Sequence, residues 1–144
     1  MGTYTGLRFK GIIKEEFRDD FEAIALRGAW KESSDEKFKN FGMDEHADNI
    51  PNYDEYSGYP EYWEYRTVEH KPVYVVETGY WEFMCSLKNY DKTIEHFFQL
   101  LPYFIDRTLV VEKYIECDDY VNSYCLTNGE VKLTNIRELE DYEI

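Results

Sequence analysis

The three histidines, His46, His70 and His96, are the side chains most readily used for acid–base catalysis or metal binding near neutral pH. His46 stands in the run Asp44-Glu45-His46-Ala47-Asp48, which combines carboxylates with an imidazole. A metal site needs several converging ligands, and no second histidine follows at a ligand spacing. We therefore expect no metal and no cofactor, and we interpret this run as a solvated acidic loop.

A cysteine nucleophile would need a nearby histidine and a positive environment that lowers the thiol pKa. Cys85 lies in an apolar run, and Cys117 is flanked by Glu116, Asp118 and Asp119, which raise a thiol pKa instead. The chain has no nucleophile elbow, phosphate-binding loop or zinc-protease motif. Adjacent carboxylate pairs are abundant and indicate solvated faces. We therefore predict no catalytic residue and regard an enzyme as the weaker interpretation.

Acidic and aromatic side chains alternate in the middle of the chain. Residues 44–65 hold seven acidic side chains, no basic one, and five tyrosines spaced by three. Carboxylates attract a basic partner over long range, and rigid rings anchor a contact. We therefore predict a partner-binding face in this segment. The predicted contact residues are Asp54, Glu55, Tyr56, Tyr62, Trp63 and Glu64. In the alternative interpretation, the tyrosines lie flat on the sheet and cover it.

The charge of the whole chain excludes several ligand classes. With 144 residues, 30 acidic and 16 basic side chains, the chain carries a formal charge of −14. Nucleic-acid and anionic membrane surfaces attract basic proteins, so we expect neither ligand. No apolar run is long enough to span a membrane, and the N-terminus lacks a secretory signal pattern. Three cysteines, an odd number, suit reduced thiols, so we expect a cytoplasmic protein.

Hydrophobic periodicity predicts the elements of the first half of the chain. Leu7, Phe9 and Ile13 alternate with polar residues, which is typical of a strand. From residue 15 the period changes to three or four, so we predict an amphipathic helix over 15–31. Ser33 and Glu36 form a capping-box pattern that predicts a short helix closed by Gly42. Residues 44–65 contain proline and glycine without periodicity and predict a long loop.

The second half reads mostly as strands. Ile94, Phe97, Phe98 and Leu101 form a helical stripe after Asn89 and Asp91, and Pro102 is expected to end or bend that helix. Asn128-Gly129 predicts a type I′ hairpin. The predicted strands are 66–70, 73–78, 80–87, 108–116, 120–127 and 130–134.

These elements predict one domain over residues 1–144, in the α+β class. An antiparallel sheet needs its apolar face covered, and two amphipathic helices supply that cover. We therefore expect both main helices on one face, in a ferredoxin-like arrangement with extra strands. The long loop at 44–65 is the main insertion into it.

Three hypotheses for function follow. The first is a non-enzymatic acidic binding protein, an inhibitor or an immunity or anti-defence antagonist of a basic, nucleic-acid-handling protein. The second is a small-molecule-binding regulatory domain, with an aromatic pocket formed under the 44–65 loop by tyrosines and Trp81. The third is an enzyme in which His46 or His70 meets a carboxylate in one cleft. A strand edge and the tyrosines would also suit a symmetric homodimer.

Overall fold

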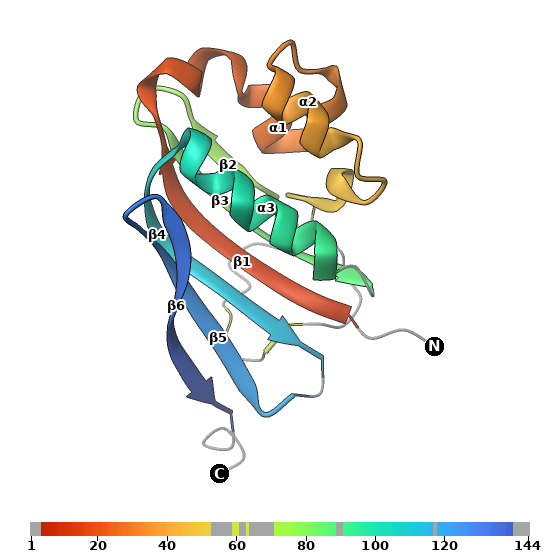
Figure 1. The fold of residues 1–144 in the computed structure, drawn as a ribbon, viewed down its shortest axis with the longest axis vertical. Helices are drawn as coiled ribbons and strands as arrows, with labels where there is room; N and C mark the ends of the chain where they lie inside the picture. The colour runs from red at the N-terminus through yellow and green to blue at the C-terminus, as the bar shows by residue number, and fades with distance from the viewer. Residues whose placement is uncertain are drawn as a thin grey trace.

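The computed structural model describes residues 4–52, 59–60, 63, 71–88, 91–116 and 118–139. Within these residues the chain forms six strands, three α-helices and three 3₁₀ helices, shown in Figure 1. The elements are β1 (Tyr4–Ile13), η1 (Glu15–Asp20), α1 (Glu22–Arg27), η2 (Trp30–Glu32), α2 (Glu36–Gly42), η3 (Ala47–Asn49), β2 (Val73–Val75), β3 (Tyr80–Lys88), α3 (Asp91–Phe104), β4 (Ile105–Ile115), β5 (Tyr120–Thr127) and β6 (Glu130–Glu138).

The six strands form one sheet in the order β2-β3-β1-β4-β5-β6, and every neighbouring pair is antiparallel. The predicted α+β class with an antiparallel sheet is therefore confirmed. β1 lies inside the sheet between β3 and β4, so both of its edges are paired. The predicted strand with one apolar face is confirmed for β1, because Leu7, Phe9 and Ile13 are all fully buried.

Aromatic rings fill the space between the sheet and the helices. The Trp81 ring lies 5.3 Å from Phe9 and 5.0 Å from Phe21, measured between ring centroids. Phe97 of α3 meets Phe9 edge-on at 5.9 Å, which places α3 against the same sheet face. Figure 1 shows α3 running along this face, with α1 and α2 at one end of it. Edge-to-face rings at these distances add attraction beyond the area they bury.

A single helix over residues 15–31 does not form, although its apolar stripe is correct. Phe21 and Ile24 are buried as predicted. The chain there divides into η1, α1 and η2, because Gly28 adopts a left-handed conformation with φ of 71° and closes α1. A side chain at Gly28 would also meet the carbonyl oxygens of Ile50 and Asp48 at 2.8 and 2.9 Å.

The short second helix forms with a different cap. Asp35 caps α2, because its carboxylate accepts hydrogen bonds from the backbone N–H groups of Lys37 and Phe38. Ser33 instead accepts a hydrogen bond from the backbone N–H of Asp35. Gly42 is the last helical residue, and it has no positive φ. It is required by close packing, since a Cβ there would lie 2.5 Å from the backbone nitrogen of Lys31.

Several boundaries in the second half differ from prediction. The helix continues two residues beyond Pro102 to Phe104 and passes directly into β4, which begins at Ile105. β2 ends at Val75, and β6 extends to Glu138. The predicted hairpin turn is confirmed, because Asn128 and Gly129 both have positive φ, 52° and 78°. The predicted strand at 66–70 lies outside the described residues.

Candidate functional site

Asp44 connects the segment after α2 to helix α3. Its carboxylate accepts hydrogen bonds from the Thr93 hydroxyl at 3.0 and 3.1 Å and from the backbone N–H of His46 at 3.0 Å. It also lies 3.2 Å from Nδ1 of His96. Thr93 and His96 are three residues apart on α3, a spacing that puts both side chains on the same helix face.

The contacts of Asp44 change its acidity. Partial burial alone would raise the pKa of Asp44, because it disfavours the charged form. The hydrogen bonds from His46, Thr93 and His96, together with the charge of His96, outweigh that effect and lower the pKa below its ordinary value. Asp44 is therefore held as a carboxylate that fixes the position of the imidazole.

The Asp44–His96 pair resembles the second and third members of a catalytic triad, but its surroundings do not complete one. The side chain of His96 is 52% exposed. Among the described residues, no serine or cysteine hydroxyl or thiol is hydrogen-bonded to His96. Cys85 is buried in the sheet. In the described part of the chain, the pair is therefore an imidazole held by a carboxylate, with no nucleophile beside it.

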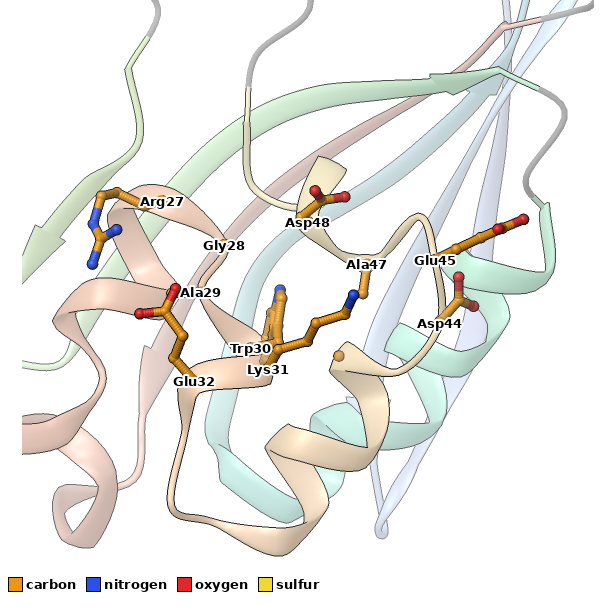
Figure 2. Close-up of a pocket in the computed structure, with 11 residues that line it drawn as sticks. Arg27, Gly28, Ala29, Trp30, Lys31, Glu32, Asp44, Glu45, Ala47 and Asp48 are labelled. Atoms are coloured by element: carbon orange, nitrogen blue, oxygen red, sulfur yellow. The ribbon is translucent and has the colours of Figure 1, made fainter.

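A polar pocket of about 260 Å³ lies on one side of Asp44, between the turn after α1 and the segment that carries η3. Figure 2 shows Arg27 and Glu32 on the α1 side and Asp44, Glu45 and Asp48 on the opposite side, with Lys31 extending between them. Gly28, Ala29, Trp30, Gly42 and Ala47 complete the lining. Charges of both signs surround this pocket, so it suits a small polar molecule carrying both an acid and a base.

A wider groove of about 540 Å³ lies on the other side of Asp44, between α2 and α3. Phe41, Met43, Leu100 and Tyr103 give it an apolar lining. Lys37 sits over the Tyr103 ring at 4.7 Å, and the Tyr103 hydroxyl donates a hydrogen bond of 2.7 Å to Asp35. This hydrogen bond, with burial and the Asp35 charge adding to it, raises the pKa of Tyr103.

Five of the predicted contact residues, Asp54, Glu55, Tyr56, Tyr62 and Glu64, lie outside the described residues. Trp63 is described, and its side chain is fully buried yet separate from the main core. Its ring lies 6.0 Å from Tyr59, and its indole nitrogen has no hydrogen-bond partner among the described residues. In this position the Trp63 ring is not exposed to a partner.

The histidines and Trp81 that the sequence analysis considered do not form one site among the described residues. His46 is paired with Glu45 at 3.2 Å, and His70 lies outside the described residues. Within the part of the chain that the structure describes, no three metal-ligating side chains come together. Trp81, expected under the loop, is instead a core residue whose indole nitrogen donates a hydrogen bond to the Ala25 carbonyl at 2.9 Å. It lines neither pocket.

A second acidic surface lies on η1 and α1, where the sequence analysis predicts only solvated carboxylates without a binding role. Its members are the exposed side chains of Glu15, Glu16, Asp19, Asp20 and Glu22, here called the η1 carboxylates. Arg18 lies among them, but its guanidinium donates hydrogen bonds to the carbonyls of Ile13 at 2.9 Å and Glu77 at 3.4 Å. No ion pair of the described residues involves these carboxylates. The neutral charge count of residues 1–43 concealed them.

Exposed apolar side chains lie next to the η1 carboxylates. The Arg18 contact to Glu77 brings the turn after β2 beside η1, and Val76 in that turn is exposed. Leu26 of α1, which packs beside β2, is exposed as well. Negative charge beside apolar side chains is the composition of a protein-binding surface.

Comparison with models of known protein families, with curated proteins and with solved structures gives no match for this chain. In the described part of the chain, every helix is too short or too polar to cross a membrane.

Proposed function

We propose that this chain is a non-enzymatic acidic binding protein that docks on a basic protein partner. It would act in the cytoplasm as an inhibitor, or as an immunity or anti-defence antagonist of a nucleic-acid-handling protein. In such an interface carboxylates stand where the phosphates of a nucleic acid would lie.

One observation carries this proposal: the η1 carboxylates are exposed and form no ion pair with another described residue, while the Arg18 guanidinium donates hydrogen bonds to backbone carbonyls. Carboxylates that serve solubility alone are usually interspersed with bases. Here they stand near exposed Val76 and Leu26, which supply apolar contact area. Asp54, Glu55, Tyr56, Tyr62, Trp63 and Glu64 remain proposed contact residues on the sequence pattern of residues 44–65.

Affinity capture from host lysate tests the proposal. The wild-type chain is immobilised at low salt and bound proteins are eluted with rising salt, because screening weakens contacts between opposite charges. One variant carries Asp19→Asn, Asp20→Asn and Glu22→Gln, and a second carries Asp54→Asn, Glu55→Gln and Glu64→Gln. The matched control carries Glu95→Gln, Asp118→Asn and Asp119→Asn, which removes three exposed carboxylates elsewhere.

We expect a basic protein that elutes early from one of the two surface variants and normally from the control. Each of the three variants removes three negative charges, so a difference between them reports local contacts. Two results would contradict the proposal. One is a captured partner whose elution does not depend on salt concentration, and the other is a partner that elutes from all three variants at the same salt concentration.

A second candidate function is small-molecule binding in the polar pocket beside Asp44, which the rim of Arg27, Lys31, Glu32 and Asp48 favours. A ligand that binds only the folded state raises its stability, by about 2.7 kcal/mol at a concentration of 100 Kd. Thermal unfolding with free amino acids as probes tests this candidate. A melting temperature that rises in wild type and stays constant in Lys31→Ala supports it, and no rise with any amino acid contradicts it.

We further propose that the fold is ferredoxin-like. The strand order β2-β3-β1-β4, with α1 and α2 before β2 and α3 between β3 and β4, supports this arrangement, and β5 and β6 extend the sheet. Contacts of both Phe21 and Phe97 with Trp81 support helices on one face. An experimental structure with α1 and α3 on opposite faces would contradict it.

A further inference from the structure

Strand β6 forms one edge of the sheet and is exposed along almost its whole length. Among the described residues it has a strand neighbour on one side, β5, and its nine residues run from Glu130 to Glu138. Leu133 is 51% exposed and Ile136 is 53% exposed. A long edge strand with exposed apolar side chains is a template for pairing with another strand.

The charge of the β5–β6 hairpin differs from that of the chain. Residues 120–138 contain two bases, Lys132 and Arg137, and two acids, Glu130 and Glu138. The hairpin is therefore neutral in a chain of net charge −14. An edge adapted to a strongly basic partner would be acidic, and an edge protected by repulsion would carry charge of one sign. A neutral edge suits a partner of its own kind.

A register shift in β6 brings its apolar side chains to one face. Leu126 pairs with Val131 and Asn122 pairs with Ile136, with the shift between Ser123 and Tyr124. Leu126 and Asn122 are an even number of residues apart, so their partners Val131 and Ile136 share a face although they are five residues apart. Leu133, opposite Tyr124, lies on the same face.

We propose that β6 pairs antiparallel with β6 of a second copy of this chain, forming a symmetric dimer with a continuous sheet. A two-fold interface must be self-complementary. One register sets Val131 opposite Ile136 of the second copy, so apolar side chains meet on one face of the sheet. The same register sets Glu130 opposite Arg137 of the second copy, so an acid meets a base on the other face. Each such pair occurs twice.

The dimer has a salt dependence opposite in sign to that of binding a basic partner. Two chains of net charge −14 repel each other at long range, and salt screens this repulsion while the neutral edges pair. Association of copies therefore strengthens with salt, whereas the proposed basic partner binds more weakly. The two proposals fail independently.

Sedimentation velocity over a concentration series, at low and at high salt, tests the dimer. For wild type we expect a species of twice the 17.4 kDa chain mass that increases with protein concentration and with salt. Leu133→Lys and Ile136→Lys should each raise the dimer dissociation constant at least about tenfold, since an apolar contact at the centre of an interface is replaced by a charge. Both substitutions make the chain less negative, so added repulsion between whole chains cannot explain the loss.

Leu109→Lys is the matched control, because Leu109 is also 51% exposed and lies on β4, which β5 separates from the β6 edge. It should dimerise like wild type. Circular dichroism verifies that all three variants fold. A monomer at every concentration and salt, or equal weakening by Leu109→Lys and Leu133→Lys, overturns the proposal. A dimer that dissociates when salt is added also overturns the proposal.

Discussion

The Thr93 hydroxyl donates its hydrogen bond to the Asp44 carboxylate, joining helix α3 to the segment after α2 across 49 residues of sequence. Thr93 is buried and the Asp44 side chain is 17% exposed, so water is a poor substitute for either partner. The contact also sets the boundary between the polar pocket and the α2–α3 groove, both of which Asp44 lines.

Replacing Asp44 by Asn should destabilise the protein by about 1–2 kcal/mol at neutral pH, because an amide accepts fewer and weaker hydrogen bonds than a carboxylate. The pKa of Asp44 is lowered on folding, so its stabilising contribution is complete above the ordinary value of 3.8 and is lost as pH falls through the lower pKa of the folded state. Urea unfolding should therefore show the difference between wild type and variant shrinking below about pH 4. Asp48→Asn, at an exposed position, is the control.

Tyr74 should lose its proton only in strong alkali. Burial raises its pKa to about 12, with Asp19 and Glu22 adding to the effect and Arg18 opposing it. Its hydroxyl donates a hydrogen bond of 2.5 Å to the Arg18 carbonyl. The raised pKa means that Tyr74 stabilises the fold fully below pH 10 and that this contribution disappears as pH rises from 10 to 12.

Stability measurements between pH 8 and 12 on wild type and Tyr74→Phe test the Tyr74 prediction. The advantage of wild type should be constant below pH 10 and decline above it. Tyr120→Phe, which removes a tyrosine that is 47% exposed, provides the comparison. A constant difference between wild type and Tyr74→Phe across the whole range would contradict the prediction.

Gly42→Ala should destabilise the protein by about 1–3 kcal/mol, the usual cost of an added methyl group in a packed site. The new Cβ would lie 2.5 Å from the Lys31 nitrogen and 2.9 Å from the Trp30 carbonyl carbon, and both atoms are backbone. In an unobstructed helix the same change stabilises by about 1 kcal/mol, so the sign of the effect tests the packing. Asn40→Ala, at an exposed position in the same helix, should be close to neutral in the same denaturation experiment.

Gly129→Ala should cost about 1–2 kcal/mol for a different reason. No atom lies within 4 Å of the added Cβ, but φ at this position is 78°. The cost comes from the backbone conformation, so Asn128→Gly in the same turn should be nearly neutral. Equal stability of Gly129→Ala and wild type in thermal unfolding would mean that the turn relaxes to another type.

The elements that could be predicted from sequence are those with local causes. Alternation located β1, a helical stripe located α3, and Asn128-Gly129 located the last hairpin. The division of residues 15–31 could not be predicted in the same way. Gly28 ends α1 where the carbonyls of Asp48 and Ile50 approach it, and those residues are remote in sequence.

The candidate site could not be predicted from the sequence for the same reason. Asp44 was recognised as acidic, but its partners Thr93 and His96 come from another helix and share no spacing pattern with it. The η1 carboxylates are visible in the sequence as charges, yet only the structure shows that the Arg18 guanidinium donates to backbone carbonyls and forms no ion pair with them. Such relationships arise from tertiary contacts, which periodicity and composition do not encode.

The three tryptophans are divided between two separate buried environments. Trp30 and Trp81 belong to the main core, while Trp63 is equally buried outside it. Indole fluorescence therefore carries two signals, and a chain retaining Trp63 alone would report on its own surroundings independently of the core. Rising denaturant would then reveal, by the order of the red shifts, whether the two environments open together or one after the other.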